Sequence, residues 1–92
     1  MNMRCRGEKF RAWADPALHL RHHEETLDDG RSIDVQTRLS RTGETQLFIG
    51  VYSKTGDRIV EETYSSRPNE SMIGALLWGV LRARTFVAGG WR

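Results

Sequence analysis

Three glycines recur at intervals of 13 residues in the middle of this 92-residue chain: Gly30, Gly43 and Gly56. Each lies in a polar tetrad, and the tetrads 41–44 and 54–57 repeat one chemistry: a basic residue, Thr, Gly and an acidic residue. Glycine supplies the positive φ that a tight hairpin needs, in a type I′ turn or in a type I turn followed by a G1 bulge. The spacing therefore predicts a meander of three or four antiparallel strands.

The segments between the glycines have the patterns of strands. Residues 32–40 alternate, which is typical of a half-buried strand with Asp34 and Gln36 toward solvent. Residues 46–52 are apolar on both faces, so we expect a central strand that is covered on each side. Residues 58–64 also favour a strand.

The outer segments of the predicted meander carry more charge. Glu61 and Glu62 are neighbours, so at least one of them must face solvent. Residues 18–27 give the weakest strand pattern, because the alternation of Leu18 and Leu20 with polar residues gives way to a polar run.

A helix is predicted after the meander. Pro68 ends the last strand, Asn69 is a suitable N-cap, and Gly89 with Gly90 ends the helix. We expect the helix to run from about residue 70 to 87.

The predicted helix is apolar nearly all round, which indicates cover on more than one side. Ala75, Gly79 and Ala83 form a row of small residues at i, i+4 and i+8. Two interpretations are open for this row: close packing on the sheet, or an interface with a partner or a second copy.

The whole chain, 1–92, is short enough for a single α+β domain. We divide it into a basic N-terminal arm or short helix (1–16), the β-meander (17–65), the C-terminal helix (69–87) and a tail (88–92). The short N-terminal helix would cover the second face of the central strand.

Charge is uneven, although the net charge is only +2. Both ends are basic and residues 15–70 are acidic. The basic side chains of the arm are interleaved with Phe10 and Trp13, which is an arrangement that can bind phosphates and stack on bases. An alternative function is therefore nucleic-acid binding through Arg4, Arg6, Lys9 and Arg11.

Catalytic and metal-binding patterns are weak. His19, His22 and His23 form the only dense cluster of metal-capable side chains, but their spacing matches no zinc motif, and an exposed edge strand explains them as well. Cys5, which lies between two arginines, has no base nearby in the sequence. We expect no enzyme activity, no cofactor and no bound metal.

One cysteine cannot form an intramolecular disulfide, which favours a reducing compartment. The N-terminus lacks the apolar stretch of a signal peptide, and the longest apolar run, 72–81, is half the length of a membrane-spanning helix. The prediction is a cytoplasmic protein that does not contact membranes.

These observations favour a small non-catalytic regulatory protein that binds another protein, or itself as a homodimer. A domain of this size has a thin core, and its central strand and helix carry more apolar surface than one layer covers. The residues predicted to bind the partner are Phe48, Ile73, Leu77, Trp78 and Trp91.

Overall fold

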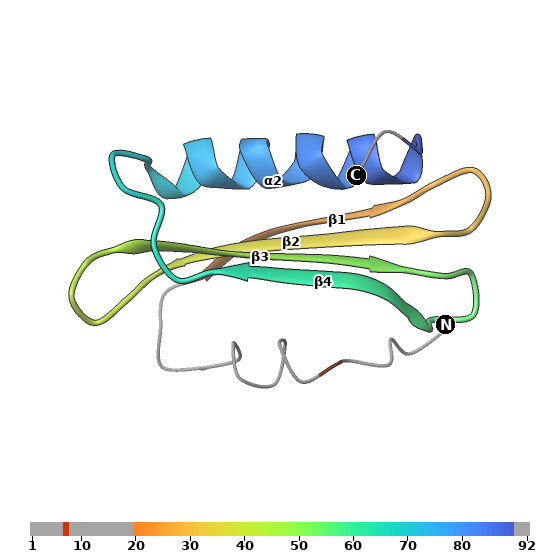
Figure 1. The fold of residues 1–92 in the computed structure, drawn as a ribbon, viewed down its shortest axis with the longest axis horizontal. Helices are drawn as coiled ribbons and strands as arrows, with labels where there is room; N and C mark the ends of the chain where they lie inside the picture. Colours follow the sequence, from red (N-terminus) through yellow and green to blue (C-terminus); the bar gives the residue numbers. More distant parts are fainter. Residues whose placement is uncertain (1–6, 8–19, 90–92) are drawn as a thin grey trace.

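The structure is a computed structural model in which Gly7 and residues 20–89 are described. In this part of the chain, four antiparallel strands form one sheet in sequential order, and one helix lies across a face (Figure 1). The elements are β1 (Leu20–Thr26), β2 (Ser32–Leu39), β3 (Thr45–Tyr52), β4 (Arg58–Tyr64) and α2 (Met72–Val87). The predicted α+β meander with a C-terminal helix is confirmed. The short helix predicted near the N-terminus lies outside the described residues.

The three turns share one geometry. In each of them the glycine has a positive φ, between 85° and 93°, while no other turn residue does. A type I′ turn needs positive φ at both central residues, so the turns are type I with a G1 bulge. In the second turn, for example, the Gly43 N–H donates to the Ser40 carbonyl, and the Ser40 N–H donates to the Glu44 carbonyl.

Two of the turns are also chemical copies, as their sequences indicate. The hydroxyl of Ser40 accepts the N–H of Glu44 at 3.0 Å, and the hydroxyl of Ser53 accepts the N–H of Asp57 at 3.0 Å. These bonds satisfy backbone donors inside the turn. The repeat therefore encodes hairpin geometry.

The core lies between α2 and the central strands. β2 and β3 present Ile33, Val35, Leu47, Ile49 and Val51 to the helix, all of them fully buried. The helix packs against these side chains with a row of small residues. Ala75, Gly79 and Ala83 are buried against the sheet. Of the two interpretations of this row, close packing on the sheet is the one observed.

The start of α2 differs from the prediction. Its N-cap is Ser71, whose hydroxyl accepts the Gly74 N–H at 3.0 Å. Asn69, the predicted cap, instead takes a left-handed conformation with φ 65°, which Asn tolerates better than most residues. Asn69 lies in the segment that joins the end of β4 to the start of α2. At the other end, Gly89 has a φ of 84° and follows the C-cap Ala88, as predicted for the glycine that ends the helix.

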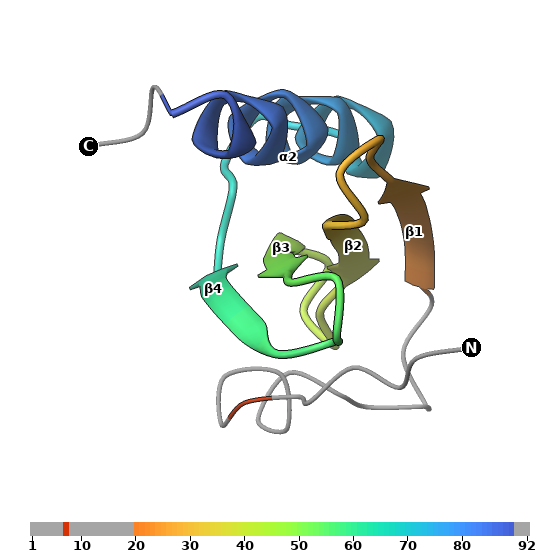
Figure 2. The ribbon, with the colours of Figure 1, turned by 90° about the vertical axis from the view of Figure 1, so that its right-hand side faces the viewer.

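The sheet curls away from α2 at its β4 edge (Figure 2). The register of β3 against β4 shifts between Val51 and Tyr52, so that Ile59 is the extra residue of a bulge. Trp78 of α2 lies on this side of the helix. It packs edge-on against Tyr64 with ring centroids 5.5 Å apart, and the Arg67 guanidinium lies 4.1 Å from the Trp78 ring centroid.

The sheet face that points away from α2 is also buried. Phe48 and Tyr52 of β3 are fully buried there, which confirms that the central strand is covered on both sides. Asp34 and Gln36 share this face and are buried as well, so the expectation of a half-buried second strand with these side chains in solvent is wrong. Alternation in the sequence identified the two faces of β2 but gave no sign that the polar one is covered.

The close contact at Gly79 gives the first prediction. A Cβ at this position would lie 2.7 Å from Val35 Cγ1 and 3.0 Å from Leu47 Cδ1. Alanine raises helix propensity by about 1 kcal/mol, but overpacking costs about 1–3 kcal/mol and the branched Val35 cannot swing aside easily. We expect Gly79→Ala to lower the free energy of unfolding by about 1 kcal/mol, measured by urea denaturation.

Gly74→Ala is the matched control in the same helix. Its Cβ would lie 3.3 Å from the Ser71 hydroxyl and meet nothing closer. We expect this variant to raise the free energy of unfolding by up to about 1 kcal/mol, because helix propensity rises and the Ser71 hydroxyl needs only a small shift to accept the new methyl group. Stabilisation of equal size by both substitutions would contradict tight packing at Gly79.

Candidate protein-binding surface

The outer side of α2 carries an exposed apolar row. Ile73, Leu77 and Leu81 lie at i, i+4 and i+8, and their side chains are 56%, 60% and 61% exposed. Polar side chains are few in α2: its first turn has no acidic residue, and Arg82, Arg84 and Thr85 all lie in its C-terminal part. A helix that packs on a sheet ordinarily turns polar residues outward. We name these three residues the exposed apolar row.

Opposite charges flank the exposed apolar row. Arg84 follows it and donates from Nε and Nη2 to the Glu25 carboxylate of β1, the shortest contact being 2.7 Å. Glu70 precedes it, and its Oε1 accepts from the Arg67 Nε at 2.7 Å. The surface therefore has an acidic residue at one end and a basic residue at the other.

The Arg84 contact also lowers the pKa of the Glu25 carboxyl on β1. Hydrogen bonds from Arg84, and then from His23, hold the pKa of Glu25 below its usual value of 4.5. The carboxylate is therefore ionised at neutral pH, and it ties the end of α2 to the edge of the sheet.

The structure divides the five predicted protein-binding residues. Ile73 and Leu77 are exposed together on one face. Phe48 is fully buried beneath the sheet and is not part of any exposed surface. Trp78 is partly buried in its contact with Tyr64 and Arg67, and Trp91 lies outside the described residues. Leu81, which the sequence-based prediction omits, belongs to the same row, as its spacing of four from Leu77 indicates.

A buried polar cluster on the far face of the sheet is the feature that sequence reasoning missed. Asp34, Gly50 and Glu61 are cross-strand neighbours in one row. The Tyr52 hydroxyl donates to Glu61 Oε2 at 2.9 Å, and the Gly7 N–H donates to the same oxygen at 3.1 Å. These donors offset part of the cost of burying a carboxylate.

Gly50 makes the tyrosine contact possible. A Cβ at this position would lie 2.7 Å from the Tyr52 hydroxyl, so the ring lies directly over the glycine on its way to Glu61. A lone glycine inside a strand commonly marks such a close approach, and this was the available signal. Because Asp34, Glu61 and Tyr52 are all buried, the cluster is closed to a substrate and we assign it to stability.

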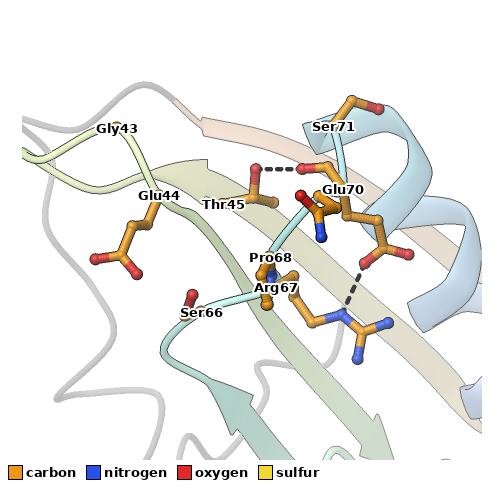
Figure 3. A pocket seen from close by; sticks show the side chains of 9 residues that line it. Gly43, Glu44, Thr45, Ser66, Arg67, Pro68, Glu70 and Ser71 are labelled. Carbon is orange, nitrogen blue, oxygen red and sulfur yellow. Dashed lines mark hydrogen bonds and ion pairs between the residues drawn. The ribbon is translucent and has the colours of Figure 1, made fainter.

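A hollow of about 380 Å³ lies between the turn that joins β2 to β3 and the segment that leads into α2 (Figure 3). Four of its lining residues hold this junction together. Thr45 donates to the Glu70 carbonyl at 2.7 Å, Glu70 binds Arg67, and Ser71 caps the helix. We therefore assign the hollow to the structural junction between the sheet and α2 and not to a ligand site.

The two described histidines, His22 and His23, lie on an edge strand of the sheet. β1 is an edge strand, where His22 lies 3.3 Å from Glu24 and His23 lies 3.1 Å from Glu25. Among the described residues, no group of three metal-capable side chains comes together. His19 lies outside them. In the same part of the chain, no helix is long and apolar enough to cross a membrane.

The predicted nucleic-acid-binding residues, Arg4, Arg6, Lys9 and Arg11, and Cys5 with them, lie outside the described residues. The two arginines near the end of α2 are each bound to a carboxylate. Arg82 makes two hydrogen bonds to Glu62, at 2.8 and 3.1 Å, and Arg84 binds Glu25.

Comparison of the chain with protein-family models, with curated proteins and with solved structures gave no match. The geometry of the described surface is therefore the basis for a functional proposal.

The ion pair between β1 and α2 predicts a pH dependence. A carboxylate whose pKa is lowered by folding stabilises the protein above its unfolded pKa, and this contribution is lost as the pH falls through the folded pKa. Glu25→Gln should therefore lower the thermal midpoint at neutral pH, and its difference from the parent should shrink as the pH falls below 4.5. Thermal melts followed by circular dichroism across this range measure the effect.

Glu24→Gln is the matched control, since Glu24 is half exposed and its ion pair with His22 is 3.3 Å long. Exposed pairs of this kind contribute little. A pH-independent difference for Glu25→Gln would contradict the role of the Arg84 contact.

The buried tyrosine gives a further prediction. Tyr52→Phe keeps the ring and removes the hydroxyl donor from buried Glu61, so we expect the free energy of unfolding to fall by about 1–3 kcal/mol. Tyr64→Phe serves as the control, because its acceptor Glu62 is partly exposed and also binds Arg82. An equal loss in both variants by urea denaturation would contradict a special cost at Glu61.

Proposed function

We propose that this chain is a small non-catalytic interaction protein that binds another protein chain through the outer face of α2. The single observation that carries the proposal is the exposed apolar row, in which three adjacent large aliphatic side chains are each more than half exposed. Contiguous apolar side chains of this kind are typical of protein-binding surfaces.

The packing of α2 supports the proposal. The small residues of α2 pack against the sheet. Ile73, Leu77 and Leu81 point away from it and are not part of the core between the layers. Covering an apolar side chain is favourable in proportion to the area removed from water, at about 25 cal/mol per Å². Burial of the exposed apolar row by a partner would therefore contribute to the free energy of binding without any change of fold.

The absence of catalysis is part of the proposal. In the described residues, the Glu61 carboxylate beside Tyr52 is buried, and the histidines lie on an open strand edge. Neither arrangement offers a nucleophile with an adjacent base in an accessible cavity. The proposed compartment is the cytoplasm, as the single cysteine favours.

Nucleic-acid binding through Arg4, Arg6, Lys9 and Arg11 stays a prediction. The ion pairs of Arg82 and Arg84 give it no support from the helix, because each cation is already neutralised by a carboxylate. The exposed apolar row therefore favours protein binding over nucleic-acid binding.

Site-specific photo-crosslinking in living cells tests the proposal. A benzophenone amino acid at position 77 should give discrete covalent adducts with protein, because the row is covered by a partner. The same amino acid at position 59 is the control, since Ile59 is also an exposed apolar residue, on β4.

The decisive measurement is whether the adducts depend on the other residues of the exposed apolar row. Leu81→Asp should abolish the adducts formed at position 77, because a carboxylate in the interface loses its hydration. Adducts that persist in this variant, or equal labelling at positions 59 and 77, would contradict the proposal.

A further inference from the structure

We infer that the partner of the exposed apolar row is a second copy of this chain, with two α2 helices antiparallel about a two-fold axis at Leu77. This inference rests on the proposed function and names its partner. It follows from the order of side chains along the outer face of the helix.

The apolar side chains are symmetric about Leu77. In an antiparallel pair with its axis at position 77, each residue faces the one equally far on the other side. Leu77 then meets its own copy, and Ile73 meets Leu81 of the other chain. A two-fold interface must be complementary to itself, and this spacing of four on each side meets the requirement.

The charges are antisymmetric about the same residue, which is what an antiparallel pair needs. Glu70 lies seven positions before Leu77, in the segment just ahead of the N-cap Ser71, and Arg84 lies seven positions after Leu77 within α2. The symmetric arrangement brings each Arg84 toward Glu70 of the other chain, twice per dimer. The antiparallel helix dipoles agree in sign with this arrangement.

Both charged groups keep donor or acceptor capacity for such a contact. Arg84 uses Nε and Nη2 to bind Glu25, and Glu70 uses Oε1 to accept from Arg67. Among described residues, Arg84 Nη1 and Glu70 Oε2 have no hydrogen bond. A parallel pair would instead place like charges side by side, so the charge pattern selects the antiparallel one.

An interface centred on three side chains per copy is small beside the roughly 800 Å² per partner of a standard stable complex. We therefore expect a reversible dimer that forms over micromolar to millimolar concentrations. Analytical ultracentrifugation over this range should show the average mass rising toward twice the 10.6 kDa of one chain.

Disulfide mapping in a Cys5→Ser background tests the geometry. Helix axes 8–10 Å apart bring facing Cα atoms to about 3.5–5.5 Å, which overlaps the Cα separation of a disulfide. Leu77→Cys should therefore link to itself on mild oxidation. Ile73→Cys should not, because its two copies are about 12 Å apart along the axis at a rise of 1.5 Å per residue. Mixing Ile73→Cys with Leu81→Cys should restore the link, and Ile59→Cys is the control for random collision.

Charge exchange tests the complementarity. Each variant loses one ion pair within its own chain, to Glu25 or to Arg67, and this loss is the same in the self-dimer and in the mixed dimer. Arg84→Glu and Glu70→Arg are each combined with Leu77→Cys. Either variant alone places like charges opposite each other in its own dimer, whereas the mixed dimer has two attractive contacts. Mixing the two should give the mixed disulfide at several times the statistical yield, measured by mass spectrometry.

Four results would overturn the inference. Linking at position 77 no faster than at position 59 removes the second copy as the partner. Self-linking at positions 73 and 77 alike indicates a parallel pair. A statistical yield of mixed disulfide removes the charge contact. Photo-adducts at position 77 that contain only other proteins would leave the proposed function standing and remove self-association. Circular dichroism of each variant confirms that the fold is kept.

Discussion

The close approach of α2 to the two central strands determines most of this structure. Gly79 lies so near Val35 and Leu47 that even a methyl group has no room. Because the contact needs small residues, it fixes which side of the helix faces the sheet. Once Ala75, Gly79 and Ala83 point inward, Ile73, Leu77 and Leu81 must point outward. The same contact that holds the layers together therefore creates the exposed apolar row.

The two faces of the sheet are stabilised by different means. The face under α2 is a dry aliphatic core, whose stability comes from burial. The other face combines Phe48 and Tyr52 with buried carboxylates, so it depends on hydrogen bonds to Glu61. A polar cluster of this kind is costly when a partner is removed, because the carboxylate that remains is cut off from water.

The edges of the helix and sheet are joined by charged groups. Arg84 binds Glu25 at the β1 edge, and Arg82 binds Glu62 at the β4 edge. These contacts use the basic end of the chain to neutralise its acidic centre. The uneven charge distribution, which suggested nucleic-acid binding, is therefore explained in part by contacts within the fold.

The amino-acid sequence by itself determined the meander and the ends of its strands. Gly30, Gly43 and Gly56 mark turns in which only glycine adopts the required φ cheaply, so their spacing was sufficient. The apolar character of α2 was also plain from its residues. Only the tertiary structure decided how that surface is divided: the small residues face inward, Phe48 is buried, and three aliphatic side chains remain exposed. Local patterns record which side chains are apolar, but the partner that covers each one comes from contacts between residues far apart in the chain.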